Sequence, residues 1–316
     1  MLKPEAVTGR ERAMAVAVLG RFAQAILNAH THGLVIAVFR RSFYIRFGDE
    51  VVCVGPPGLG KGPLNVLADV PSDLEWPAVG LATQQNALRS GALLSVGARL
   101  RFDLNGAAVW QAPPSPVFSA AELRQGLRLL ADSARRRAPG GLGVLLTTLD
   151  QTETAPPHAK DDPLVQAALW PIAAIWHWLG MALAGSPEVP PSVDGLVALG
   201  PGLTPSGDDF LCGVMAALVY FGHRDIAARL AAVVLPVALR ETSLISAAYL
   251  SCATQGQASA VLFDALESIL AGGRDLEARL DAVHAVGHTS GWDSLVGAAG
   301  VCAALARQPA LSASGS

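Results

Sequence analysis

Charge is scarce in this sequence. Only 16% of its 316 residues are charged and 51% are apolar, whereas charged residues make up about 25% of a typical soluble protein. The formal net charge of −3 argues against nucleic acid as the main partner, because phosphate backbones are bound by strongly basic surfaces. A weakly acidic, strongly apolar chain instead favours burial of its surface against other subunits.

Cysteine is also sparse, and its four positions show no C-x-x-C spacing. This pattern excludes a disulfide scaffold and predicts reduced, core-filling thiols in a cytoplasmic protein. Charges at 3, 5 and 10–12 make the N-terminus unlike a signal peptide. The cysteines are Cys53, Cys212, Cys252 and Cys302.

Residues 164–184 contain no Asp, Glu, Lys or Arg, and this run has enough residues to span a bilayer. Gln166, Pro171 and His177 interrupt it, and it has no basic flank on one side. The run therefore predicts a helix that is buried or contacts another subunit, and we expect no membrane association.

Short runs rich in β-branched and aromatic residues dominate from Gly33 to Gln111. They predict strands at 34–39, 42–47 and 51–54, and a hairpin of 98–104 with 107–111 through Asn105-Gly106. Residues 13–29 show apolar spacing closer to that of a helix. The pattern indicates a small antiparallel β barrel or sandwich.

The pattern becomes helical after the prolines at 113–116. Ser119 and Glu122 form a capping box, and 140–149 could add a strand. The fold class is thus α+β, with a β-rich domain at 1–112 and an α-helical domain at 118–308. Helices are expected at 119–137, 163–184, 205–222, 224–239, 242–253, 257–271, 275–287 and 293–307.

The most unusual stretch reads G-P-G-L-T-P-S-G-D-D at 200–209. Its glycines allow positive φ and its prolines fix φ, so it is a loop that leads into a helix. Either Thr204 or Ser206 could cap that helix, whose start would attract anions. The adjacent carboxylates of Asp208 and Asp209 favour the helix dipole, or hold a metal, a proton or a cationic group.

Three other stretches have similar chemistry. The sequence G-H-T-S-G-W-D at 287–293 also precedes an apolar helix, and His288 could carry a proton. A further apolar helix is expected to begin at E-T-S-L-I-S, residues 241–246. Gly55 to Gly62 nearly matches a phosphate-binding P-loop and includes Lys61, but Gly62 replaces the Mg²⁺-binding hydroxyl. Ordinary turns and helix caps remain the alternative for each.

The run L-G-P-G-L-T-P-S-G-D-D-F-L-x-G, with the stretches at 241–246 and 287–293, resembles the signature of the AllH-like family. The resemblance covers roughly residues 30 to 305. It implies a subunit of oxamate carbamoyltransferase in purine (allantoin) degradation, which converts oxalurate and phosphate to oxamate and carbamoyl phosphate. It also implies other carbamoyltransferase subunits as partners, and small anionic substrates. Assembly into a homo-oligomer remains a further possibility. No cofactor and no metal are expected.

Two other functions remain open: a non-catalytic scaffold subunit that completes a partner's active site, and a metal-dependent hydrolase using Asp208, Asp209 and Asp293. We expect 202–209 and 287–293 to lie side by side, with the 55–62 loop nearby. The candidate catalytic residues are Asp208, Asp209 and His288. The candidate substrate- or anion-binding residues are Gly200, Gly202, Thr204, Ser206, Gly207, Arg240, Thr242, Ser243, Thr289, Ser290, Gly291, Asp293 and Lys61.

Overall fold

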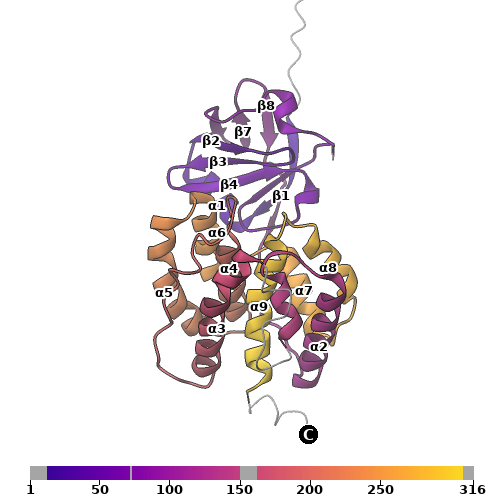
Figure 1. Ribbon diagram of the computed structural model, residues 1–316. Helices are drawn as coiled ribbons and strands as arrows, with labels where there is room; N and C mark the ends of the chain where they lie inside the picture. Colours follow the sequence, from indigo (N-terminus) through magenta and orange to yellow (C-terminus); the bar gives the residue numbers. More distant parts are fainter. Residues whose placement is uncertain (1–12, 72, 150–161, 309–316) are drawn as a thin grey trace, which may run out of the picture. The chain divides into compact units, whose positions relative to one another are not determined.

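The computed structural model describes residues 13–71, 73–149 and 162–308. The chain divides into two compact units, 1–110 and 111–316. The first is built from strands and the second from helices (Figure 1). The α+β fold class expected from the sequence is therefore confirmed.

The N-terminal unit is a closed β barrel. Its sheet has the order β5-β4-β3-β2-β6-β7-β8-β1-β9, and a further pairing of β1 with β5 closes the ring. Most neighbours are antiparallel, but β1 runs parallel to β8 and β9, and β4 runs parallel to β5. The elements are β1 (Met14–Gly20), α1 (Arg21–Ala29), β2 (His32–Val38), β3 (Phe43–Phe47), β4 (Glu50–Gly55), β5 (Asn65–Ala68), β6 (Asn86–Ser90), β7 (Leu93–Val96), β8 (Leu100–Asp103) and β9 (Ala108–Trp110).

A cluster of aromatic rings fills the barrel. Phe43, Trp76 and Phe102 are fully buried, and the rings of Phe43 and Trp76 meet edge to face at 4.8 Å. Such pairs add to the stabilisation that comes from burying apolar area. The fold is thus a barrel with a filled interior, and the antiparallel description holds for only part of it.

Two local predictions in this unit are wrong. The hairpin through Asn105-Gly106 does not form: β8 and β9 both pair with β1, at successive positions along it. Gly106 still makes a turn with φ of 72°. Residues 13–29 are only half helical, because β1 occupies the first part and closes the barrel with β5.

The C-terminal unit is helical, as predicted. Ser119 caps α2, accepting from the Glu122 amide while its hydroxyl donates to the Glu122 carboxylate. Residues 141–148 form a 3₁₀ helix (η3), so the extra strand expected there is absent from this described segment. The helices are α2 (Ala120–Arg137), α3 (Pro163–Leu183), α4 (Ser206–Tyr220), α5 (Arg224–Glu241), α6 (Leu244–Thr254), α7 (Ala260–Leu270), α8 (Leu276–His284) and α9 (Ser290–Ala306).

Helix α4 is the centre of this unit. All fifteen of its residues are buried, and Figure 1 shows α9 beside it. A Cβ on Gly213 would lie 1.9 Å from the Ser294 carbonyl oxygen of α9, and one on Gly297 would lie 2.0 Å from the Phe210 carbonyl oxygen of α4. The two backbones approach so closely that only glycine fits at each position.

Helix α3 corresponds to the long uncharged run. Among the described helices it is the one long and apolar enough to cross a membrane, and 33% of its apolar window is buried. Seven of its side chains, including those of Ile172 and Leu179, are buried in the helical unit. Trp170 is 82% exposed. The helix thus buries one face and leaves an apolar face uncovered.

Candidate functional site

The starts of α4 and α9 lie together, as the sequence predicts for 202–209 and 287–293. The Thr204 Oγ1 and Ser290 Oγ atoms are 3.2 Å apart and share a hydrogen bond. Thr204 lies in the loop before α4, and Ser290 is the first residue of α9. Two glycine- and hydroxyl-rich loops, 86 residues apart in the chain, therefore meet side chain to side chain.

The start of α6 joins the same cluster. Ser243 caps α6 by accepting from the Ser246 amide at 3.0 Å. Its hydroxyl also donates to the Leu203 carbonyl oxygen at 2.6 Å, which ties the cap to the loop before α4. Three helix N-termini are thus linked through residues 203–204, and the positive ends of three helix dipoles lie near one another.

Asp208 is the most heavily bonded side chain of the cluster. Its Oδ1 accepts from the Ala198 amide at 2.9 Å, and its Oδ2 accepts from Thr242 Oγ1 at 2.5 Å and from Ser246 Oγ at 2.7 Å. The residue is fully buried. Asp208 therefore connects the backbone at Ala198 and the start of α6 to the start of α4.

Asp209 and Asp293 differ from Asp208 because each keeps an unused oxygen. Both are buried, and the Oδ2 atom of each has no hydrogen-bond partner among the described residues. Asp293 Oδ1 accepts from the Leu142 amide at 2.7 Å. A buried acceptor without a donor costs about 1–3 kcal/mol, so both oxygens are expected to gain a proton or a ligand donor.

The electrostatics of the pair favour the protonated form. Burial raises the pKa of Asp209 well above its ordinary value, the charges of Asp293 and Asp208 raise it further, and the Ser290 and Thr204 hydroxyls oppose the shift. Burial also raises the pKa of Asp293 to about 6, although the Thr289 and Ser206 hydroxyls and the Leu142 amide lower it. Both shifts favour the protonated acid over the carboxylate.

Glycines let the backbones come close around these carboxyl groups. A Cβ on Gly207 would lie 1.9 Å from the Leu196 carbonyl oxygen, and one on Gly291 would lie 2.2 Å from that of Val283. Gly200 and Gly202 have φ of 114° and 94°, a conformation that side chains strongly disfavour. Each of these four candidate residues therefore has a backbone reason for being glycine.

The start of α4 differs in detail from the prediction. Pro205 is the N-cap, and no side chain caps the helix. Thr204 is therefore free to contact Ser290, and Ser206 lies inside the first turn, 4% exposed. Neither of the two predicted capping arrangements forms, because both hydroxyls face the neighbouring loop and carboxyl groups instead.

Two of the candidates make no hydrogen bond to the three aspartates within the described chain, and a third belongs to the other unit. His288 is exposed in the turn before α9 and, within the described chain, makes no hydrogen bond to the three aspartates. Arg240 belongs to the last turn of α5 and donates to the Pro236 carbonyl oxygen of its own helix at 2.8 Å. Lys61 is exposed in the N-terminal unit, so its role and that of the 55–62 loop stay predictions.

Two contributors were missed from the sequence. Ser246 donates to Asp208 from the first turn of α6, and Thr242, four residues earlier and just before that helix, donates to the same oxygen. Gly141, with φ of 61°, presents the Leu142 amide to Asp293. The spacing could have revealed Ser246, but no local pattern marks the Leu142 contact, which spans 151 residues.

The cluster offers a buried acid beside hydroxyl donors and helix N-termini, which suits proton transfer and anion binding. Within 13–71, 73–149 and 162–308, no group of three or more acidic, histidine or cysteine side chains is placed to hold a metal ion. The metal-dependent hydrolase that would use Asp208, Asp209 and Asp293 stays a hypothesis.

Together, the barrel unit and a helical unit with converging helix starts define a two-unit α+β protein whose candidate site lies in the helical unit. Residues 196–302 match the family model of the oxamate carbamoyltransferase subunit AllH. The family resemblance noted in the sequence is thereby confirmed over this segment, which contains Asp208, Asp209, Asp293 and the hydroxyls around them. No solved structure matches the chain.

Proposed function

We propose that this protein is a catalytic subunit of an oxamate carbamoyltransferase-like enzyme. The observation that carries the proposal is the buried Asp209 carboxyl group, with its unused oxygen and raised pKa, at the meeting point of three helix starts. This cluster lies within the segment that matches the AllH model. The name of that model supports other carbamoyltransferase subunits as partners, and a cytoplasmic location accords with the same reading.

The reaction requires one proton transfer that Asp209 would perform. When a phosphate oxygen attacks the carbamoyl carbon of oxalurate, the bond from that carbon to the oxamate nitrogen breaks. The leaving nitrogen then needs a proton, and a carboxyl group that stays protonated near neutral pH can donate it. In the reverse direction, the carboxylate would take the same proton from oxamate.

The Thr204 and Ser290 hydroxyls would connect the buried acid to the substrate. They are half-buried, they bond to each other, and both influence the Asp209 carboxyl group. A hydroxyl can donate and accept at once, so the pair can pass a proton between Asp209 and a substrate bound outside it. Asp208 would be a positioning residue, because donors already occupy its oxygens.

Substrate anions would be held mainly by helix starts. The helix dipoles of α4, α6 and α9 favour negative charge, and the glycines admit close backbone approach. No lysine or arginine side chain hydrogen-bonds to the three aspartates in the described parts of the chain. Phosphate and oxalurate would therefore be bound by amide and hydroxyl groups, with any further cation supplied by a partner subunit.

The test compares Asp209→Asn with the wild type in the conversion of oxalurate and phosphate to carbamoyl phosphate, assayed alone and with co-purified subunits. We expect a loss of at least about tenfold in kcat, equivalent to about 1.4 kcal/mol. The wild-type rate should fall as pH rises through the Asp209 pKa, because a general acid must be protonated. The rate of Asp209→Asn should not show this decrease with rising pH.

Asp225→Asn is the matched control, because Asp225 is an exposed carboxylate in the first turn of α5. It should keep the wild-type rate and pH profile. Turnover that is unchanged in Asp209→Asn would rule out the general-acid role and leave the chain as a scaffold for a partner's site. Absence of turnover in every assembly would overturn the proposed reaction.

A further inference from the structure

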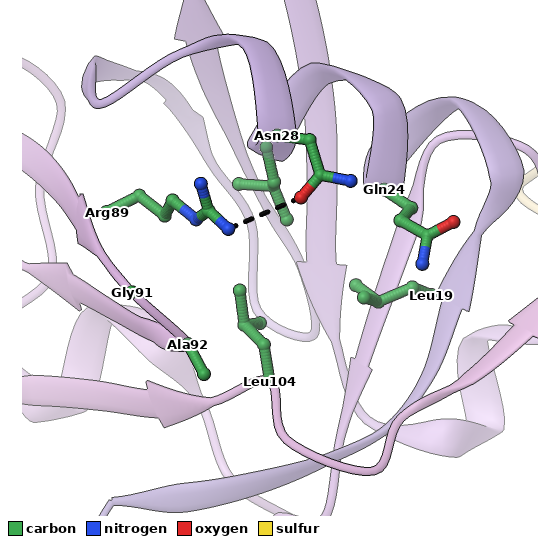
Figure 2. A pocket seen from close by; sticks show the side chains of 8 residues that line it. Leu19, Gln24, Asn28, Arg89, Gly91, Ala92 and Leu104 are labelled. Carbon is green, nitrogen blue, oxygen red and sulfur yellow. Dashed lines mark hydrogen bonds between the residues drawn. The ribbon is translucent and has the colours of Figure 1, made fainter.

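A second candidate site lies in the β barrel, and none of its residues belongs to the candidate site of the helical unit. It is a cavity of about 170 Å³ formed by α1, the end of β1, β6 with its following turn, and Leu104. Figure 2 shows Arg89 entering from β6 toward Asn28 on α1, with Gln24 beside Leu19 on the other side. The cavity thus has apolar walls and three polar side chains.

The Arg89 guanidinium is incompletely satisfied. Its Nη2 donates to Asn28 Oδ1 at 3.3 Å, which is long for such a bond. Its Nε is buried and has no hydrogen-bond partner among the described residues. In the described part of the barrel, Arg89 forms no ion pair, and no carboxylate lines the cavity. A half-buried cation therefore faces this cavity without a counter-charge.

The shape and chemistry indicate a particular ligand class. A guanidinium presents a planar fork of donors that matches a carboxylate, and such pairs are stronger than neutral hydrogen bonds. The Gln24 and Asn28 amides can each donate to or accept from a second polar group. The cavity is smaller than the roughly 300–1,000 Å³ typical of drug-sized ligands, so only a compound of a few heavy atoms fits.

We propose that this cavity binds a short monocarboxylate, held by Arg89 through the carboxylate and by Gln24 and Asn28 through an adjacent carbonyl or amide. The proposal does not depend on the function assigned to the helical unit, because all of its residues belong to the N-terminal unit.

The experiment is a calorimetric titration of the full-length protein with oxamate, acetate and inorganic phosphate. We expect oxamate to bind more tightly than acetate, because only oxamate carries an amide beside its carboxylate. Arg89→Gln should weaken oxamate binding about tenfold or more, the usual effect of losing a charged hydrogen bond. Arg99→Gln, an exposed arginine of the same unit, should bind as the wild type does.

Two further variants make the result decisive. Ala92→Phe should block binding by filling the cavity without changing charge, which covers the case in which Arg89→Gln folds poorly. Asp209→Asn should bind oxamate at this site as the wild type does, which separates it from the helical-unit site. The proposal is overturned if Arg89→Gln and Ala92→Phe both leave the affinity and the number of oxamate molecules bound per chain unchanged, or if no oxamate binds up to about 10 mM.

Discussion

Environment, rather than residue type, separates the two adjacent aspartates at the start of α4. Successive residues of a helix point about 100° apart, so Asp208 and Asp209 face different neighbours. Asp208 meets three donors, while Asp209 meets a second buried carboxyl group and keeps a free oxygen. The first is suited to holding the loop and α6 in place, and the second to exchanging a proton.

The raised pKa of Asp293 makes stability depend on pH. Its folded-state pKa is about 6, above the ordinary 3.8, so the folded state binds more protons between these values. Its contribution is therefore fully present below about pH 4 and is lost as pH rises through 6, so that stability has fallen by about 3 kcal/mol at pH 7. Asp293→Asn should remove this loss, because its amide oxygen can still accept from the Leu142 amide.

Urea unfolding of wild type and variant between about pH 4 and pH 7 measures the difference. Subtracting one curve from the other cancels the shared contribution of Glu277, whereas the contribution of Asp209 changes because the charge of Asp293 raises its pKa. Asp225→Asn, an exposed carboxylate, should keep the wild-type slope. A free energy of unfolding that falls equally with pH in Asp293→Asn and wild type would show that Asp293 titrates normally.

At the scale of elements, the crossing of α4 and α9 brings the site residues together. Gly213 and Gly297 let the two helices touch backbone to backbone. Asp209 and Asp293 each lie four residues before one of these glycines, within one turn of the contact. The close approach therefore sets the separation of the two carboxyl groups as well as the packing of the core.

Gly213→Ala should destabilise the helical unit by about 2 kcal/mol or more, because overpacking against backbone outweighs the gain of up to about 1 kcal/mol in helix propensity. Gly180→Ala is the matched control in α3, where an added Cβ would meet no atom within 4 Å. That control should be neutral or stabilising. Thermal and urea unfolding measure both, and equal stability of the two variants would contradict the close crossing.

The sequence predicted elements where the signal was local. The Ser119 capping box marked the start of α2, and the shared Gly, Ser, Thr and Asp pattern predicted the meeting of Thr204 with Ser290. Predictions failed where distant partners decide the structure. Asn105-Gly106 does form a turn, but pairing with β1 prevents the hairpin. The Leu142 amide reaches Asp293 across the chain, without any local pattern that marks it.

At the scale of the whole molecule, low charge follows from how much of the helical unit is interior. Helix α4 is buried on every side, and thirteen of the seventeen residues of α9 are buried. Neither helix therefore has a broad solvent-exposed face that would call for charged residues. Some apolar side chains remain uncovered, including Trp170 at 82% and Leu239 at 77% exposure. Such residues accord with a protein that contacts other subunits.

The full chain should stay in the supernatant after high-speed centrifugation of a detergent-free lysate. Although α3 is long enough to cross a bilayer, it buries seven side chains within the helical unit, and extraction into lipid would expose those contacts. Recovery only with the membrane pellet, and release only by detergent, would show that α3 leaves the unit to enter the bilayer.

The pairing of α4 with α9 has a consequence for biosynthesis. Translation delivers the chain from its N-terminus, so α4 emerges well before α9, its main partner. During that interval α4 is an apolar helix with two carboxyl groups that α9 does not yet cover. The ribosome or a chaperone would have to shield it until α9 is made. Helix α9, which follows the other described helices in the chain, thus completes both the hydrophobic centre and the acid pair, and a nascent chain interrupted before Ser290 would have neither.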